Sequence, residues 1–206
     1  AANYDPTYGG FGDAPKFPRP SLPVFILRQS LRAQEDAAVE AVLHTCRKMA
    51  AGGMYDLVGG GFHRYSVDDR WLVPHFEKML YDNALLASTY LHAWVVTGEA
   101  RYRAVAGETL DYVIRELRLP DGGLASAQDA DTNGVEGLTF TWTEEEGVPA
   151  ELLQPFEHGR SIVRGELDGS LQARLLAERS LRPQPGLDDK VLASWNGLAL
   201  AALAEG

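Results

Sequence analysis

The sequence has little of what several common protein classes require. Cys46 is the only cysteine among 206 residues, which excludes an internal disulfide and a Cys-x-x-Cys redox pair within this chain. The least polar run, residues 191–204, is shorter than the roughly 20 apolar residues of a membrane helix and contains Asn196. Residues 1–5 lack the basic and apolar regions of a signal peptide. We therefore expect a cytoplasmic protein with no membrane partner.

Positive charge is also scarce. The chain has 19 Lys and Arg against 29 Asp and Glu, a formal net charge of −10. A surface of this sign repels nucleic acids, so we expect no nucleic-acid partner. His75 and Glu77 have no second His or Cys at metal-ligand spacing, and the sequence has no His-Glu-x-x-His motif. We therefore expect no metal and no cofactor, in a single domain over residues 1–206.

Helical patterns dominate what is present. Between Asp36 and the Gly52-Gly53 pair, apolar residues recur at i, i+3, i+4 and i+7, which predicts a helix with one buried stripe that includes Cys46. We expect this cysteine to be buried and inert. Similar signals predict helices over residues 21–33, 75–96, 170–179 and 190–206, and a further helix after Gly98.

Two long loops separate these helices, over residues 53–66 and 121–137. Asn133-Gly134 in the second loop is a strong signal for a short β-hairpin. Residues 138–142 alternate in polarity and are expected to form a strand. Thr143 and Glu146 then match a capping box that opens a helical turn.

A faint internal repeat indicates the architecture. Residues 78–85 (Lys-Met-Leu-Tyr-Asp-Asn-Ala-Leu) resemble residues 190–198 (Lys-Val-Leu-Ala-Ser-Trp-Asn-Gly-Leu), with one residue inserted. The first and last helices are apolar or small almost all round, as expected of helices that are covered on both sides. We therefore predict an all-α fold, the front half of an α/α toroid of helical hairpins, with a short β-hairpin in a loop. Uncovered helices of such a partial ring should self-associate.

Several long motifs also resemble a known family. They are Gly-Gly-Phe-Gly-Asp-Ala-Pro-Lys-Phe-Pro (9–18), Gly-Gly-Gly-Phe-His-Arg-Tyr-Ser-Val-Asp (59–68), Trp-Leu-Val-Pro-His-Phe-Glu-Lys-Met-Leu-Tyr-Asp-Asn-Ala (71–84), Ser-Ala-Gln-Asp-Ala-Asp (126–131) and Asp-Asp-Lys-Val-Leu-Ala-Ser-Trp-Asn-Gly-Leu (188–198). In this order they resemble the thioredoxin-domain-containing family that includes the spermatogenesis-associated protein of animals and its bacterial relatives. The resemblance covers nearly the whole chain.

The resemblance implies a particular domain organisation. Members of the family carry an N-terminal thioredoxin-like domain, followed by a helical toroid similar to six-hairpin glycosidases and N-acylglucosamine 2-epimerases. This chain matches only the front part of that toroid. The thioredoxin-like domain and the remaining hairpins are absent from it, and residues 143–180 are shorter than the same region of relatives. Fold alone does not fix the reaction.

The first candidate site is acidic. Asp129 and Asp131 lie two residues apart, which places them on one face of a strand, with Glu136 across the predicted hairpin. Paired carboxylates can act as general acid and base in the cleavage of a glycosidic bond. The alternative is a solvated turn, because Asp and Asn favour turns in any case.

The second candidate site contains histidines. His63 and His75 lie near four charged residues in the sequence, namely Arg64, Asp68, Glu77 and Lys78. A sugar 2-epimerase needs a base that moves a proton next to a carbonyl, and histidine suits this role near neutral pH. An equally good interpretation is that these histidines have a structural role and are hydrogen-bonded to nearby carboxylates.

Aromatic side chains in or beside the loops fit a carbohydrate cleft, since sugar rings stack on aromatic faces, although most aromatic residues simply belong to a core. The candidates for substrate binding are Tyr55, Trp71, Tyr81 and Trp195, together with Asp189 and Asn196. An Asn inside an otherwise apolar helix needs a polar partner. We expect Asp129, Asp131 and His75 to line one cleft with the Trp195-Asn196 turn.

Two classes of function remain open. The first is an enzyme that hydrolyses or 2-epimerises a sugar, with catalysis by Asp129, Asp131, His75 and Glu77. The second is a non-catalytic module that binds a glycan or a protein, such as the thioredoxin-like domain of relatives. The two classes differ in whether the carboxylates face a bound sugar.

Overall fold

The computed structural model describes residues 3–33 and 36–206, so the first two residues of the opening segment considered above lie outside it. Helices are the main regular elements of this part of the chain. They are α1 (Ser21–Ala33), α2 (Asp36–Ala51), α3 (Leu80–Thr97), α4 (Ala100–Glu116), α5 (Gly169–Ser180) and α6 (Ala193–Glu205). Short strands lie in the connections: β1 (Tyr65–Ser66), β2 (Pro74–His75), β3 (Lys78–Met79), β4 (Ala127–Gln128), β5 (Asp131–Thr132), β6 (Val135–Glu136), β7 (Leu153–Pro155), β8 (Ser161–Val163) and β9 (Leu187–Asp188). The fold is all-α, as the sequence predicts.

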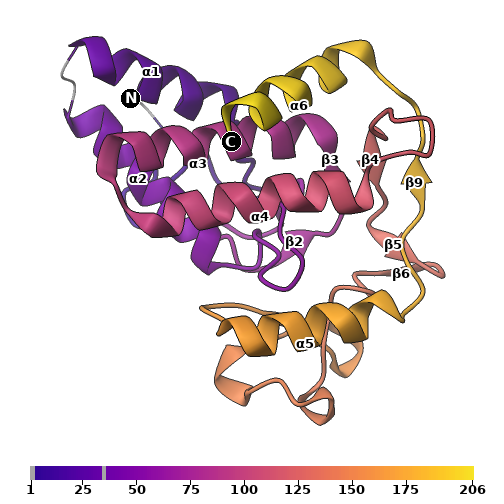
Figure 1. Ribbon diagram of the computed structural model, residues 1–206. Helices are drawn as coiled ribbons and strands as arrows, with labels where there is room; N and C mark the ends of the chain where they lie inside the picture. Colours follow the sequence, from indigo (N-terminus) through magenta and orange to yellow (C-terminus); the bar gives the residue numbers. More distant parts are fainter. Residues whose placement is uncertain (1–2, 34–35) are drawn as a thin grey trace.

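The helices pack as hairpins around α3. Helix α2 packs on α1 and α4 packs on α3, while α3 also contacts both α1 and α6 (Figure 1). Because α3 has neighbours on several sides, it is buried along most of its length. Helices α1, α3 and α6 form one inner row, and α2 and α4 are the outer partners of the first two. This is part of an α/α toroid.

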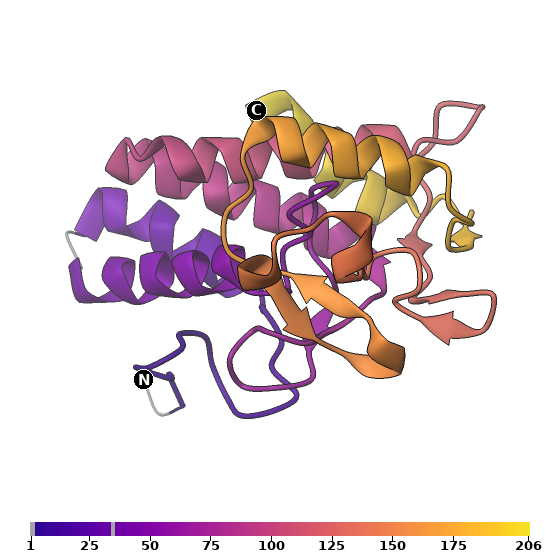
Figure 2. The same cartoon turned by 90° about the horizontal axis from the view of Figure 1, so that it is seen from below.

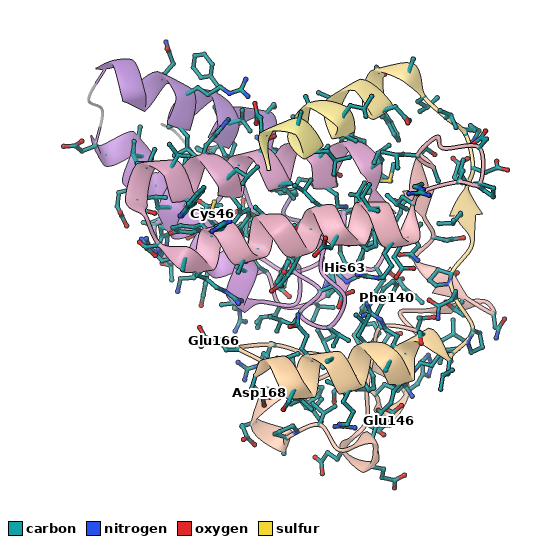
Figure 3. The ribbon with its side chains drawn as sticks, in the orientation of Figure 1. Cys46, His63, Phe140, Glu146, Glu166 and Asp168 are labelled. Carbon is teal, nitrogen blue, oxygen red and sulfur yellow. The ribbon has the colours of Figure 1, made fainter. Side chains whose placement is uncertain are left out.

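Residues 139–186 form a layer beside the hairpins (Figures 1 and 2). The layer contains α5, the antiparallel pair β7–β8 and three short 3₁₀ turns, Glu144–Glu146, Ala150–Leu152 and Glu157–Gly159. Trp142 and Leu175 from this layer are fully buried in the main hydrophobic core. Figure 3 places Phe140 at the junction between the layer and the hairpins. The layer is therefore packed onto the toroid as part of one core.

The start of the third helix is a correction to the sequence-based expectation. Helix α3 begins at Leu80 rather than at His75. His75 pairs with Tyr65 in the β1–β2 ladder, and Lys78 pairs with Gln128 in the β3–β4 ladder. Strand pairing with residues far along the chain outweighs the helical pattern in this segment, and His75 is therefore not at a helix N-terminus.

Two further expectations need correction. The last helix begins at Ala193 rather than near Lys190, because Leu187 and Asp188 form β9 against β4. Residues 138–142 do not form a strand. The chain turns there, with the Phe140 and Thr141 amides both donating to the Gly137 carbonyl oxygen at 3.0 Å, and Trp142 alone pairs with Ser161.

Other local expectations are confirmed. Asn133 and Gly134, with φ of 55° and 76°, form the turn between β5 and β6, as expected of a two-residue hairpin loop. The Thr143 amide donates to Glu146 at 2.7 Å in the predicted capping box. Cys46 is fully buried on the apolar stripe of α2.

The inner helix α6 is covered on one side only. Ala199 and Ala202 are buried against α3 and α4, whereas Leu198 and Leu200 are 38% and 63% exposed. No helix within the described residues combines the length and the apolarity needed to cross a membrane.

The internal repeat is visible in backbone contacts. The Asn83 side chain in α3 accepts a hydrogen bond from the Phe62 amide at 2.6 Å and donates to the Phe62 and Met79 carbonyl oxygens. The Asn196 side chain in α6 accepts from the Leu124 amide at 3.0 Å and donates to the Leu124 and Leu192 carbonyl oxygens. The carbonyl oxygens of Met79 and Leu192 each belong to the residue four positions before the asparagine that donates to them. The two inner helices are therefore joined to the preceding loop in the same way.

Candidate functional site

A pocket of about 430 Å³ lies where β3, β4 and β9 meet the start of α6. The three strands form one antiparallel sheet in the order β3-β4-β9. Residues far apart in the sequence line the pocket: Glu77, Met79, Ser126, Ala127, Asp129, Gly186, Leu187, Asp188, Lys190, Leu192 and Trp195. Two of the proposed catalytic residues, Glu77 and Asp129, thus share one pocket with Trp195.

Glu77 connects this pocket to the histidine candidate. Its carboxylate accepts a hydrogen bond from Arg64 at 2.6 Å, and its Oε2 lies 3.9 Å from Nε2 of His75. The other ring nitrogen of His75, Nδ1, lies 2.7 Å from Oε1 of Glu136. The Tyr65 ring stacks on His75 at a centroid distance of 4.9 Å. His75 is therefore held between two carboxylates beside the pocket.

The two aspartates share one face, as alternation along an extended chain requires. Asp129 and Asp131 are exposed, whereas Ala130 and Thr132 are buried. The Asp131 amide donates to Oδ1 of Asp129 at 3.3 Å. Asp129 lines the pocket, while Asp131 lies in the β-hairpin opposite Glu136.

Two aromatic candidates lie together at the pocket. The Tyr81 and Trp195 rings are 4.7 Å apart at an interplanar angle of 57°. Trp195 is half-buried and lines the pocket, and an indole ring is a surface on which a sugar ring can stack. The neighbouring Asn196 uses its side-chain amide on the Leu124 backbone, and Asp189 is exposed.

Three other candidates lie in the interior, away from the pocket. Trp71 is fully buried and its indole N–H donates to the Tyr8 carbonyl oxygen at 2.9 Å. Tyr55 is buried and its hydroxyl donates to Glu108. His63 is 2% exposed, with Nδ1 lying 2.9 Å from the Phe76 carbonyl oxygen. Burial lowers the pKa of His63 to about 3, so its imidazole is neutral at physiological pH.

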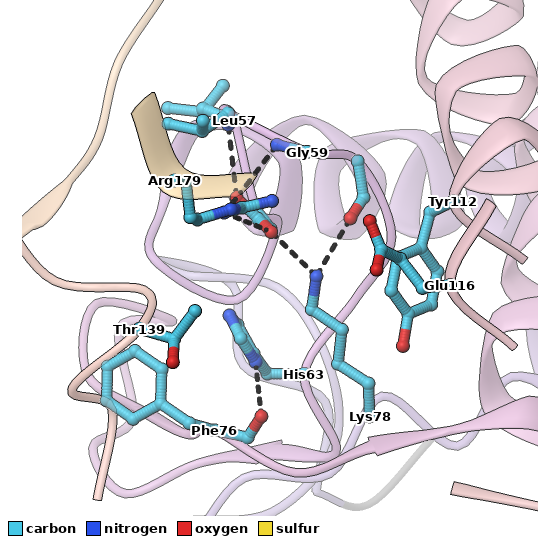
Figure 4. A network of polar contacts seen from close by, with 12 residues as sticks. Leu57, Gly59, His63, Phe76, Lys78, Tyr112, Glu116, Thr139 and Arg179 are labelled. Carbon is cyan, nitrogen blue, oxygen red and sulfur yellow. Dashed lines mark hydrogen bonds and ion pairs between the residues drawn. The ribbon is translucent and has the colours of Figure 1, made fainter. Parts of the chain in front are cut away.

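Lys78, from the second candidate site, lies in a buried cluster of charges with Asp56 and Arg179, two residues that the sequence did not single out. Arg179 Nη1 lies 2.8 Å from both carboxylate oxygens of Asp56, and Lys78 Nζ lies 2.7 Å from Oδ2 (Figure 4). Lys78 also donates to the Gly60 carbonyl oxygen at 2.9 Å. Burial lowers the pKa of Lys78 to about 8, although Asp56 acts in the opposite direction. These residues join three segments of the chain.

Asp82 is also a residue that the sequence did not single out. It lies in the first turn of α3 and is 4% exposed. Burial raises its pKa to about 7, and the charge of nearby Glu77 acts in the same direction. The sequence gives no sign of this raised pKa, because the shift depends on the residues that bury the Asp82 carboxyl in the folded chain.

Within residues 3–33 and 36–206, no three His, Cys, Asp or Glu side chains converge in a geometry suited to a metal ion. The pocket lining contains three carboxylates, one ammonium group, the Ser126 hydroxyl and the Trp195 ring.

Comparison with solved structures places the fold. The chain is similar to a sugar epimerase from a ruminal bacterium, with a TM-score of 0.54 and 15% identity over 61% of this chain and 35% of that one. It is also similar to cellobiose 2-epimerase from Spirochaeta thermophila, with a TM-score of 0.51 and 20% identity over 86% of this chain and 42% of that one. At these identities the likeness shows the shared α/α-toroid fold.

No family model matches the chain. Individual proteins do. The chain is 36% identical to human spermatogenesis-associated protein 20, over 98% of this chain and 34% of the human protein, and 35% identical to the mouse protein over 98% and 33%. The human alignment spans 263 positions, more than the 206 residues of this chain, so the human protein carries segments with no counterpart here. The chain spans about a third of the length of these relatives. Over nearly all of its own length, it is a homologue of the spermatogenesis-associated protein 20 family.

Proposed function

We propose that this chain is a carbohydrate-active domain that binds a sugar in the pocket between β3, β4, β9 and α6. The observation that carries the proposal is the meeting of Glu77, Asp129 and Trp195 in one pocket of about 430 Å³. An aromatic face stacks on a pyranose ring while carboxylates accept hydrogen bonds from its hydroxyls. Sugar epimerases that share the fold support the choice of ligand class.

The proposed reaction is acid–base chemistry on the bound sugar, either hydrolysis or 2-epimerisation. Asp129 is the proposed general base, because it forms no ion pair within 4 Å in the described part of the chain. Glu77, which is bound by Arg64 and faces His75, is the proposed partner that returns or relays a proton. His75 and Glu136 support Glu77 from outside the pocket.

A product assay with cellobiose tests the reaction. Hydrolysis releases glucose, whereas 2-epimerisation converts the reducing glucose unit to mannose without breaking the glycosidic bond, and NMR spectra of the anomeric protons separate the two. Asp129→Asn and Glu77→Gln should each reduce turnover by about a hundredfold or more. Asp13→Asn, at an exposed aspartate outside the pocket lining, is the matched control. Equal turnover by all three variants contradicts the assignment.

A non-catalytic glycan- or protein-binding module is the second candidate. Two of the three carboxylates in the pocket lining are held in ion pairs, Glu77 with Arg64 and Asp188 with Lys190. Groups that are fixed in this way suit recognition as well as catalysis. Saturable cellobiose binding without turnover favours this module, and binding of the thioredoxin-like domain of a relative, without sugar binding, favours a protein partner.

A further inference from the structure

The glycine-rich loops before the inner helices follow one backbone pattern. Tyr4 pairs with Phe11 and Tyr55 pairs with Phe62 as isolated bridges. In the first loop the Asp5 amide donates to the Gly10 carbonyl oxygen at 3.0 Å, and in the second the Asp56 amide donates to the Gly61 carbonyl oxygen at 2.9 Å. A third loop, before α6, pairs Arg118 with Leu124, and its Leu119 amide donates to the Gly123 carbonyl oxygen at 2.8 Å. The chain thus contains three copies of one unit, the third loop being one residue shorter.

In the first two units a buried lysine binds the aspartate of the loop. Lys16 donates to Asp5 at 2.6 Å and to the Gly9 carbonyl oxygen at 3.0 Å. Lys78 makes the equivalent bonds to Asp56 and to the Gly60 carbonyl oxygen, at 2.7 and 2.9 Å. Both lysine side chains have 0% exposure. Each lysine therefore has a structural task, which is to hold its loop.

The third unit replaces this ion pair with apolar residues. Leu119 takes the place of the loop aspartate. Val191 lies five residues before Asn196, as Lys78 lies five before Asn83, and a Cβ on Gly123 would lie 2.8 Å from its Cγ2 atom. Val191 therefore lies beside the third loop at the same distance from the asparagine as the lysine of the second unit, but it is 48% exposed. The neighbouring Lys190 lines the pocket, whose lining contains no residue of the loop 118–124.

Lys190 is consequently free for another task. Its side chain is 69% exposed, and it lines the pocket with Asp129 and Trp195. Its Nζ donates to both carboxylate oxygens of Asp188, at 3.0 and 2.9 Å. The hydrogen bond from Lys190 lowers the pKa of Asp188, so the carboxylate remains charged at neutral pH.

We infer that Lys190 and Asp188 form a donor–acceptor pair that binds two adjacent hydroxyl groups of a neutral sugar. The ammonium group donates to one hydroxyl oxygen and the carboxylate accepts from the next, while Trp195 stacks on the ring. The inference rests on the proposed sugar-binding function and names its substrate class. Three carboxylates, those of Glu77, Asp129 and Asp188, and one ammonium group line the pocket. This balance repels acidic sugars and sugar phosphates.

Calorimetric titration of the full chain with cellobiose, with glucuronate for comparison, tests the inference. The wild-type chain should bind cellobiose and not glucuronate. Lys190→Met should weaken cellobiose binding by about tenfold or more, the value expected for loss of a charged hydrogen bond, and leave the unfolding midpoint in urea unchanged. Lys48→Met on α2, outside the pocket lining, is the control for loss of a lysine and should bind like the wild type.

A second readout does not depend on affinity. Brief acetylation followed by mass spectrometry should modify Lys190 quickly and leave Lys16 and Lys78 unmodified, and cellobiose should protect Lys190. Wild-type affinity in the Lys190→Met variant, unprotected Lys190 in the presence of bound cellobiose, or tighter binding of glucuronate overturns this inference alone. No cellobiose binding by the wild-type chain overturns the proposed function together with it.

Discussion

Nζ of Lys78 lies 2.7 Å from Oδ2 of Asp56, with side-chain exposures of 0% and 5%. Arg179 from α5 approaches the same carboxylate at 2.8 Å. Burial by itself would raise the pKa of Asp56, but the charges of Arg179 and Lys78 outweigh it and hold the pKa well below its usual value. The Asp56 carboxylate thus joins the second glycine-rich loop to β3, through Lys78, and to the layer of residues 139–186, through Arg179.

Asp56→Asn should destabilise the fold strongly. The substitution keeps the shape but leaves the Lys78 and Arg179 charges buried without compensation, a situation that typically costs about 3–5 kcal/mol. Urea unfolding followed by circular dichroism measures the change. Asp189→Asn, at an exposed position, should lie within about 0.5 kcal/mol of the wild type. Equal stability of the two variants would show that the buried cluster contributes little.

Asn83→Ala and Asn196→Ala should both destabilise, because each leaves a loop amide and a loop carbonyl without a partner. Each loss should cost about 1–3 kcal/mol. Asn83 is fully buried and Asn196 is half-buried, so the first variant should be the less stable. Asn196→Asp keeps the acceptor for the Leu124 amide but presents a carboxylate oxygen to the Leu124 and Leu192 carbonyl oxygens, so it should not recover the loss at pH 7. Wild-type stability of this variant at pH 7 would argue against the role of the asparagine.

His63 should make a contribution to the stability of the fold that is lost in acid. Its folded pKa of about 3 is below the ordinary value of 6.5, so between these values the unfolded chain binds a proton that the folded chain does not. The contribution of His63 to stability is therefore full above about pH 6.5 and falls as the pH is lowered, by up to about 1.4 kcal/mol per unit. Asp82, whose raised pKa of about 7 lets the folded chain bind a proton first, contributes the opposite change over the same range.

Urea unfolding at pH 7 and at pH 4.5 measures the His63 contribution when the wild type is compared with a His63 variant, because the Asp82 contribution is common to both. His63→Phe, surrounded by Phe76 and Phe140, should lower stability at both pH values through loss of the bond to the Phe76 carbonyl oxygen, but with a smaller loss on going from pH 7 to pH 4.5. His158→Gln, at a side chain that is 73% exposed, is the control and should keep the wild-type difference. A His63→Phe difference as large as that of the wild type would assign the acid sensitivity to other groups.

Cys46 should not react in the folded protein. Burial raises the pKa of its thiol to about 12, so it stays protonated at pH 8, and its side chain has no exposed surface. A thiol reagent such as dithionitrobenzoate should modify it only after urea unfolds the chain. Modification of the native protein within minutes would indicate local opening of α2.

Local signals and long-range pairing explain which parts of the fold the sequence predicts. The stripe on α2 and the Asn133-Gly134 turn depend on neighbouring residues, and both were predicted correctly. The start of α3 was wrong because its segment pairs with Tyr65 and Gln128, and no local pattern announces such ladders.

The candidate site divides in the same way. Its residue types were visible in the sequence, and Glu77, Asp129 and Trp195 do share a pocket. His63 lies in the interior and not at the pocket, and this burial results from tertiary packing that the sequence does not show. The bond between Arg179 and Asp56 joins positions 123 residues apart, and only the folded chain reveals it.

The central claim is that the pocket beside Trp195 binds a sugar. The most direct measurement is a titration of the ¹⁵N-labelled chain with cellobiose, followed through the indole N–H signals of its four tryptophans. We predict that the Trp195 signal shifts saturably while the signal of Trp71, whose indole is buried and bonded to Tyr8, stays in place. No saturable shift at Trp195, or a shift confined to tryptophans outside the pocket lining, would contradict the account.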